Sequence, residues 1–137
     1  MRLIVDTNVL ISALIKDSAA RKLIMHLKAK LCSPMFLQEE IDKYKSEILK
    51  KSSLNETELM VLFNQIKSKI IILDYELFSL NYSEAEIIMN KIDPKDTPFI
   101  AAALATNSDI WSDDLHFQKQ KKIKVWKTKD LVELMKS

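Results

Sequence analysis

The chain has 137 residues, enough to bury the core of one domain, and its hydrophobic and charged fractions, 47% and 29%, are ordinary for a globular protein. A net charge of +2 excludes a histone-like polycation, the absence of glycine excludes glycine-rich phosphate-binding loops, and a single cysteine, Cys32, excludes an intramolecular disulfide. The apolar runs are too short for a signal peptide or a membrane span. We therefore expect one domain over residues 1–137 of a soluble, cytoplasmic protein with no membrane partner, and a buried Cys32 that packs as a small hydrophobic residue.

The first part of the chain alternates short apolar runs with amphipathic stretches. Residues 3–5 predict a buried strand, and residues 6–8, Asp-Thr-Asn, can cap a helix that follows it. A second helix is predicted over residues 18–28 and a strand over residues 30–32. A helix over about residues 33–51 comes next, because a serine followed by a proline is typical of a helix start.

The middle of the chain has two cap signatures on either side of its clearest strand. Asn55 with Glu58 three residues later has the spacing of a capping box, and Ser83 with Glu86 repeats it. Between them, residues 70–73 are mostly β-branched and bounded by charge, which predicts a strand.

The last part continues the same alternation. Asp96 opens an alanine-rich helix at residues 99–105, strands are predicted at 109–112 and 123–126, and Thr128 is predicted to cap a final helix. Strands that alternate with helices in this way predict an α/β fold of three layers, α/β/α, in which helices cover both faces of a central, mostly parallel, Rossmann-like sheet.

Four carboxylates stand where such a fold can bring them together. Asp6 and Asp114 each follow a predicted strand, and Asp96 begins a helix that leads into the next strand. Because the carboxyl ends of parallel strands meet at one edge of a sheet, these three converge easily, whereas Glu40 reaches that edge only if its helix leans over it. A ring of acids without a compensating base favours a hard divalent cation, Mg²⁺ or Mn²⁺, which commonly serves hydrolysis at a phosphate. The pattern therefore favours a metal-dependent nuclease.

Each of these acids also has a purely structural interpretation. Asp6 and Asp96 can be simple helix caps, Glu40 can lie on a solvated helix face, and Asp114 can belong to a turn after a strand. No cluster of histidine and cysteine suggests zinc, and Ser112 has no local histidine base that would activate it as a nucleophile.

Three other features have alternative interpretations. Asp74 follows the clearest strand, as in a phosphorelay receiver, but that function would leave the four acids unexplained. Trp111 and Trp126 can stack on bases, although their place in predicted strands is more typical of a core. A lysine-rich stretch after Asp114 can attract a phosphate backbone or can simply be a solvated face. Its members are Lys119, Lys121, Lys122, Lys124, Lys127 and Lys129.

Four segments, taken in order, resemble the motifs of the PIN domain family of metal-dependent ribonucleases, which includes toxins of the VapC type. They are residues 4–10, Ile-Val-Asp-Thr-Asn-Val-Leu; residues 39–41, Glu-Glu-Ile; residues 93–104, Asp-Pro-Lys-Asp-Thr-Pro-Phe-Ile-Ala-Ala-Ala-Leu; and residues 109–114, Asp-Ile-Trp-Ser-Asp-Asp. The resemblance covers nearly the whole chain and implies a PIN-like fold.

The resemblance also implies roles for particular residues. The acidic, catalytic site would consist of Asp6, Glu40, Asp96 and Asp114, with Asp6, Asp96 and Asp114 as metal ligands and Glu40 in an outer shell or at a second metal. Thr7 and Asn8 would orient Asp6 or hold a metal-bound water. Ser112, Asp113 and His116 would support the site or contact substrate. Asp113 stands where many relatives have a small residue, and His116, where a further acid is common, is either a substrate contact or a surface-loop histidine.

The implied reaction is hydrolysis of an RNA phosphodiester by a water that Mg²⁺ or Mn²⁺ activates, leaving a 5′-phosphate. The substrate would be single-stranded or structured RNA, and the partners a second copy of the chain in a homodimer and, for a toxin, an antitoxin protein that covers the acidic groove. The alternative is a catalytically idle PIN-like module that binds RNA or protein. Acids at all four matched positions favour the enzyme.

Overall fold

The structure, a computed structural model, describes residues 1–137 and is built around a parallel five-stranded sheet in the order β3-β2-β1-β4-β5. The strands are β1 (Arg2–Val5), β2 (Lys30–Ser33), β3 (Ile70–Ile72), β4 (Asp109–Trp111) and β5 (Val125–Trp126). In the central register Ile4 lies beside Cys32 on one neighbour and Ile110 on the other. Because all four strand pairs are parallel, every strand ends at the same edge of the sheet.

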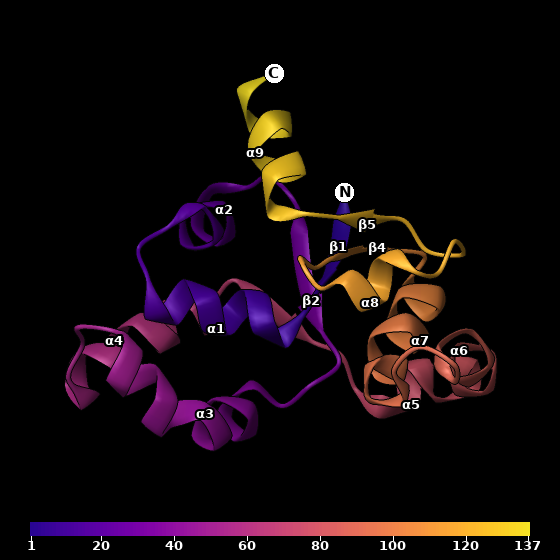
Figure 1. Ribbon diagram of the computed structural model, residues 1–137, viewed down its shortest axis with the longest axis horizontal. Helices are drawn as coiled ribbons and strands as arrows, with labels where there is room; N and C mark the ends of the chain where they lie inside the picture. Colours follow the sequence, from indigo (N-terminus) through magenta and orange to yellow (C-terminus); the bar gives the residue numbers. More distant parts are fainter.

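Helices cover both faces of this sheet. They are α1 (Thr7–Ile15), α2 (Ala19–His26), α3 (Leu37–Lys51), α4 (Glu56–Lys67), α5 (Tyr75–Phe78), α6 (Tyr82–Met89), α7 (Thr97–Thr106), α8 (Leu115–Gln118) and α9 (Thr128–Lys136), with short 3₁₀ turns η1 (Ser79–Asn81) and η2 (Pro94–Asp96). Figure 1 shows α1 to α4 on one side of the sheet and α5 to α8 on the other, which confirms the three-layer α/β/α prediction. None of these helices combines the length and the apolar character needed to cross a membrane.

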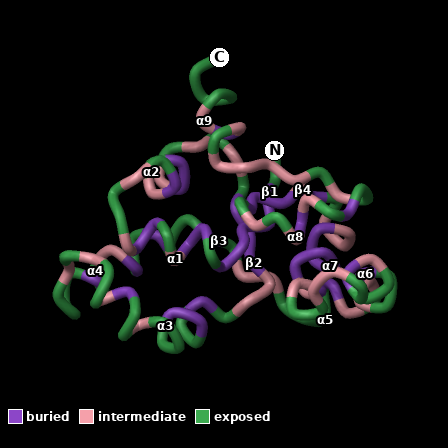
Figure 2. Tube along the Cα trace, viewed as in Figure 1, coloured by how far each residue is buried: buried purple, intermediate pink, exposed green.

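Two hydrophobic cores fill the space on either side of the sheet. Successive side chains of a strand point to opposite faces, so Leu3 and Val5 pack with α1 to α4 whereas Ile4 packs with α7. The buried residues run along the strands and recur at intervals along α1 to α4, whereas α7 is buried over much of its length (Figure 2). Cys32 is buried, as expected, and Trp111 is completely buried, which confirms its predicted place in the core.

Most predicted elements are confirmed, and two helix starts are confirmed at the level of hydrogen bonds. Asp6 caps α1, and Asn55 and Glu58 form the reciprocal hydrogen bonds of a capping box at the start of α4. The predicted strands and the remaining helices lie within a few residues of their observed bounds.

Three local predictions are wrong. The helix predicted from Ser33 begins at Leu37, because Ser33 continues β2 and its carbonyl accepts a hydrogen bond from Leu73 N. Ser83 is not a cap but lies inside α6, which follows directly on η1. Thr128 is the first residue of α9 and not its cap, and Lys127 holds the preceding position.

Two short helices, α5 and α8, have no counterpart in the sequence prediction. Each contains only four residues, too few to show a helical period, and each is held by tertiary packing through one buried aromatic residue, Phe78 or Phe117.

Candidate functional site

Asp6 lies at the carboxyl end of β1, at the centre of the sheet edge. The register places Val5 beside Trp111, so the next residues, Asp6 and Ser112, meet across the two strand ends. Ser112 Oγ donates a hydrogen bond of 2.7 Å to Asp6 Oδ2, and Asn8 N donates one of 3.4 Å to Asp6 Oδ1. Only 4% of Asp6 is exposed, so this carboxylate is fixed in position and largely removed from solvent.

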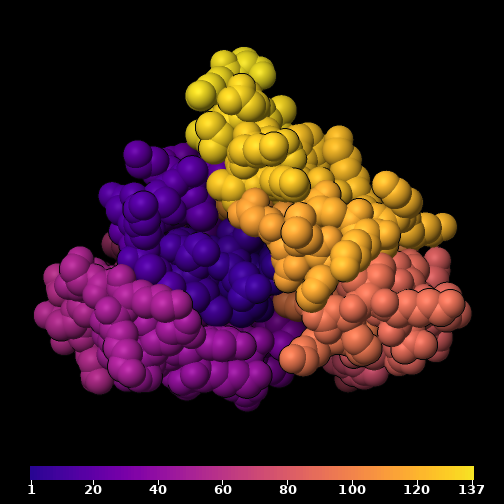
Figure 3. Space-filling model, in the orientation of Figure 1, coloured from indigo at the N-terminus to yellow at the C-terminus, as the bar shows by residue number.

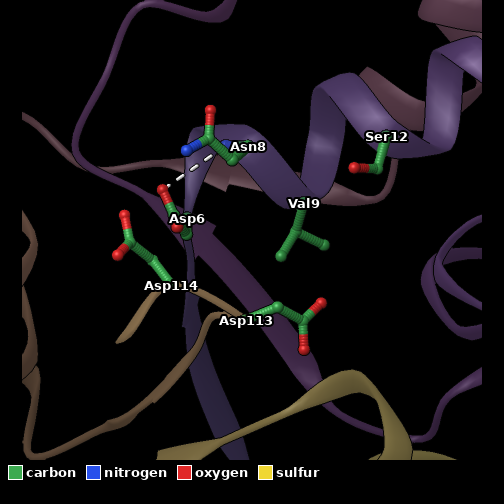
Figure 4. A pocket seen from close by; sticks show the side chains of 6 residues that line it. All are labelled: Asp6, Asn8, Val9, Ser12, Asp113 and Asp114. Carbon is green, nitrogen blue, oxygen red and sulfur yellow. Dashed lines mark hydrogen bonds between the residues drawn. The ribbon is translucent and has the colours of Figure 1, made fainter. Parts of the chain in front are cut away.

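Ser112 also fixes the second acid, Asp114. Its Oγ accepts a hydrogen bond from Asp114 N at 2.9 Å, and Asp114 Oδ1 in turn accepts one from His116 N at 2.9 Å, which caps α8. Figure 4 shows Asp6 and Asp114 close together at the end of the strands, with Asn8 above them. One buried hydroxyl therefore positions two carboxylates.

Asp96 approaches from the other core, on the turn η2 that leads into α7. His116 Nδ1 faces this turn, at 3.1 Å from Asp93 Oδ2, 3.6 Å from Asp114 Oδ1 and 3.9 Å from Asp96 Oδ2. None of these contacts has the alignment of a hydrogen bond to the ring nitrogen. Asp93, Asp96 and His116 each offer a ligand atom within 4.8 Å of the other two.

Glu40 reaches the same place because α3 does lean over the sheet edge. It is 9% exposed, lines a groove together with Asp6 and Asp96, and forms an ion pair with Lys43 at 3.0 Å. The neighbouring carboxylate raises the pKa of the exposed Lys43 ammonium, through a hydrogen bond and its charge. Glu40 is thus the one acid of the four with a protein cation directly beside it.

The groove holds about 440 Å³ and brings together all four predicted acids. Its walls are Asp6, Thr7, Asn8, Met35, Glu40, Lys43, Tyr44, Asp93, Lys95, Asp96, Phe99 and Asp114. In the space-filling view the surface is hollowed where the first residues of the chain meet the segments around α3, α7 and α8 (Figure 3). A smaller pocket of about 250 Å³ adjoins it through Asp6, Asn8 and Asp114.

The Asp6 carboxylate has no positively charged side chain close enough to stabilise its charge. Burial raises the pKa of Asp6 above its ordinary value, and the charges of Asp114 and Asp113 act in the same direction. The hydrogen bonds from Ser112 and Asn8 lower it but do not outweigh the burial.

Asp96 shows the same effect more strongly. Burial, followed by the negative charges of Asp93, Asp6 and Asp114, raises the pKa of Asp96 to about 6, against a smaller opposing effect of His116. The arrangement therefore has more negative charge than its own cations neutralise.

Two polar atoms in the groove are buried without any hydrogen-bond partner, Thr7 Oγ1 and Asp96 Oδ2. Buried polar atoms normally have partners, so these two suggest that something polar or charged completes the site. The atoms that could bind a metal ion here are carboxylate oxygens and one hydroxyl oxygen, with one imidazole nitrogen at the side. Mg²⁺ and Mn²⁺ prefer ligands of this kind. The residues present therefore fit a divalent cation.

A family model described as a PIN domain matches residues 4–135. The chain belongs to the PIN domain family. No curated protein matches the PIN chain in sequence. The matched range includes every one of the acids that form the groove.

Solved structures with the fold of this PIN chain include two VapBC structures. The crystal structure of VapBC2 from Rickettsia felis, bound to a DNA fragment from its promoter, has a TM-score of 0.69 at 16% identity and covers 93% of this chain and 98% of the other. The 2.2 Å structure of VapBC-1 from nontypeable Haemophilus influenzae has a TM-score of 0.67 at 17% identity, with 94% and 99% covered. At this identity the likeness shows a shared fold along nearly the whole length of both chains.

The remaining predicted site residues of this PIN domain are placed differently from one another. Thr7 and Asn8 line the groove, and His116 lies beside Asp93 and Asp96. Asp113, by contrast, is turned away from Asp6 in Figure 4, and both of its oxygens accept hydrogen bonds from Thr128, at 2.8 Å from N and 2.6 Å from Oγ1. Its observed contacts fasten the start of α9.

Three charged residues of the groove were not predicted as members of the site, Asp93, Lys43 and Lys95. Asp93 belongs to the third motif, and its place three residues before Asp96 across a proline was the available signal, since such a turn puts both carboxylates on one side. Lys43 follows Glu40 at the i,i+3 spacing of helix neighbours. None of the six lysines after Asp114 lines the groove.

Proposed function

We propose that this PIN domain is a metal-dependent endoribonuclease in which Asp6, Asp96 and Asp114 hold Mg²⁺ or Mn²⁺. The observation that carries the proposal is the groove in which these carboxylates converge, largely buried and without a matching number of cations. Four like charges in such a place are stable only with a positive partner. Hydrolysis at a phosphate is the chemistry that such a partner most directly serves.

The chain's own residues would position the reactants. Ser112 holds Asp6 and Asp114 at a fixed separation, so the ligand atoms need no rearrangement when the substrate arrives. Lys43 and Lys95, at the rim of the groove, would meet the phosphates on either side of the bond that is cut. A bound ion would supply Lewis acidity and lower the pKa of a water next to the phosphorus.

Glu40 and the smaller polar residues would act around this centre. Glu40, already paired with Lys43, would orient the water or a second ion from an outer position. Thr7 Oγ1, which has no protein partner, would hold a water near Asp6, with Asn8 beside it. His116 would contact the substrate or the leaving group from the side of Asp93.

We further propose that residues 1–137 form one PIN-like domain that works in the cytoplasm as the toxin of a toxin–antitoxin pair. The two solved structures described above are VapBC structures, which supports an antitoxin partner for this chain. A homodimer follows from the family resemblance. Sedimentation of the pure protein tests the dimer, and copurification with a short protein encoded beside it tests the antitoxin.

Cleavage of end-labelled single-stranded RNA tests the enzymatic function. The protein is expected to cut in Mg²⁺ or Mn²⁺, and to stop when EDTA is added or when Asp96→Asn removes one ligand. Asp17→Asn is the matched control, because Asp17 is exposed, has no ion pair and lies outside the groove. Cleavage that survives both EDTA and Asp96→Asn would contradict the proposal. RNA binding without cleavage in any metal would favour the idle, RNA-binding module instead.

A further inference from the structure

The edge of the sheet opposite the acidic groove carries a row of cations. Arg2 begins β1 and lies beside Lys30, which begins β2, and Lys69 directly precedes β3 at the next position along the edge. Lys28 stands in the loop just before β2. Neighbouring strands are about 4.8 Å apart, so three positively charged residues start three adjacent strands side by side.

These cations have no carboxylate partner. Arg2, Lys28, Lys30 and Lys69 are all exposed, and none of them forms an ion pair. Asp109 begins the next strand, β4, but it forms no ion pair with these cations. Its carboxylate instead accepts a hydrogen bond of 2.9 Å from Trp126 Nε1. Like charges side by side repel one another, and an anion bound across them removes that cost.

One hydrogen bond holds the Arg2 side chain in place and leaves most of its N–H donors free. Its Nη1 donates a hydrogen bond of 3.0 Å to the carbonyl of Thr106, at the C-terminal end of α7. A guanidinium has five N–H donors, and no other protein acceptor takes one from Arg2. The rest of its donors are therefore presented to solvent from a fixed position.

Arg2, Lys28 and Lys30 open onto a groove of about 630 Å³, whose other lining residues are Met1, Ala29, Thr106 and Asn107. No carboxylate lines it, and only two of its lining side chains are apolar. Because the strands are parallel, this groove lies at their amino ends and the acidic groove at their carboxyl ends, about 13 Å away along a four-residue strand. In Figure 1 this is the edge where the N-terminus lies, away from the start of α1.

We propose that this rear groove binds the phosphate backbone of RNA that extends beyond the acidic groove. The inference rests on the proposed ribonuclease function for the identity of the polyanion. A row of fixed, unpaired cations suits repeated phosphates, whereas the shortage of apolar side chains does not suit a protein partner. The two grooves lie at opposite ends of the strands, so RNA that occupies the acidic groove has to extend beyond it to reach the rear groove.

The test compares two triple variants with equal change in charge. Lys28→Gln/Lys30→Gln/Lys69→Gln removes the two lysines that line the rear groove and Lys69, which lies beside Lys30 in the row, and it leaves Arg2 and its bond to Thr106 intact. Lys16→Gln/Lys22→Gln/Lys50→Gln is the control, since these lysines are exposed, unpaired and line neither groove. Binding of a labelled single-stranded RNA of about 30 nucleotides is followed by fluorescence anisotropy in EDTA, over a range of salt concentration.

The rear variant is expected to bind the long RNA about tenfold more weakly than the control variant does, and to lose about 2 from the slope of log K against log salt, at about 0.7 per phosphate contact. Equal binding of the long RNA by both variants would overturn the proposal, as would a rear-variant loss seen only with duplex DNA of the same length. Because no metal is present, these results stand apart from cleavage, whose absence in Mn²⁺ would count against the ribonuclease function alone.

Discussion

At the scale of single residues, the acidic groove costs the metal-free protein stability, and Asp96 carries much of that cost. Its carboxylate is repelled by Asp93, Asp6 and Asp114 and is largely buried. Replacing it with asparagine keeps the shape and removes one charge. We therefore expect Asp96→Asn to raise the melting temperature in EDTA at pH 7 and to abolish the further rise that Mn²⁺ gives the wild type. If Asp96→Asn instead melted at a lower temperature than the wild type or failed to fold, Asp96 would be acting as a structural helix cap.

The same residue predicts how stability depends on pH. The pKa of Asp96 is raised from 3.8 to about 6 in the folded protein, so the folded state holds its proton more tightly than the unfolded state does. The contribution of this group is therefore fully present below pH 4 and is lost as the pH rises through 6. In EDTA, urea denaturation should show wild-type stability falling over that window relative to Asp96→Asn. A difference that grows in favour of the wild type with rising pH would contradict the assignment.

We expect Ser112 to affect catalysis by positioning Asp6 and Asp114, to which its hydroxyl is hydrogen-bonded. Ser112→Ala removes the donor to Asp6 Oδ2 and the acceptor of Asp114 N, so both carboxylates lose their fixed positions. Cleavage should fall about 10- to 100-fold, as for other residues that orient metal ligands. Because that hydrogen bond lowers the pKa of Asp6, its loss should also move the acid limb of the pH–rate profile upward. Ser12→Ala, at an exposed hydroxyl of the adjoining pocket, is the matched control.

The sequence predicted the convergence of the acids but not how they are held. Asp6 and Asp114 could be placed because each follows an apolar run, and a parallel sheet brings such residues together. The bond from Ser112 to Asp6 spans 106 residues, so no local pattern contains it. The ion pair of Lys43 with Glu40 has the i,i+3 spacing of helix neighbours and is visible in the sequence, whereas the lean of α3 that brings both residues to the groove is not.

At the scale of elements, a chain of hydrogen bonds fastens α9 to the end of β4. Trp111 Nε1 donates to Thr128 Oγ1 at 3.0 Å, and that hydroxyl donates to Asp113 Oδ2 at 2.6 Å. Asp113 also accepts from Thr128 N, so it takes the place of a cap at the start of the helix. Leu131, completely buried, then anchors the following turn.

Breaking this chain should cost stability without touching the groove. Thr128→Val keeps the volume but leaves the buried indole N–H of Trp111 without an acceptor, for a loss of about 1–3 kcal/mol. A lower urea midpoint with unchanged RNA cleavage is expected. Thr57→Val, at an exposed position of α4, controls for the substitution itself. A loss of cleavage as large as that of Asp96→Asn would show instead that Asp113 acts in the site.

A helix or strand could be predicted from the sequence where its own residues carry a clear periodicity, length or cap. The strands and the helix that begins after Asn55 have period, length or caps that are visible in the sequence, and they form as expected. The short helices α5 and α8 do not, because four residues fix too few hydrogen bonds to form without packing. The start of α3 was predicted too early because Ser33 belongs to β2. Its long-range hydrogen bond with Leu73 in the sheet outweighs its local preference for a helix cap.

At the scale of the whole molecule, the parallel sheet separates opposite charges to its two ends. Acids gather at the carboxyl edge, where β1 and β4 end, and cations gather at the amino edge, where β1 and β2 begin. This separation is invisible in the net charge of +2. It gives the molecule one end whose charge suits a divalent cation and another whose charge suits a polyanion, so in the proposed function RNA that reaches both ends would be drawn toward the proposed cleavage site.

We propose that a bound divalent ion, held by Asp6, Asp96 and Asp114, makes this PIN domain cut RNA. The most direct measurement follows Mn²⁺ binding by calorimetry and the rate of RNA cleavage in one titration of the same sample. Cleavage is predicted to rise and saturate with occupancy of a site that Asp96→Asn abolishes and Asp17→Asn leaves intact. A cleavage rate that does not follow Mn²⁺ binding, or a site that persists in Asp96→Asn, would contradict it.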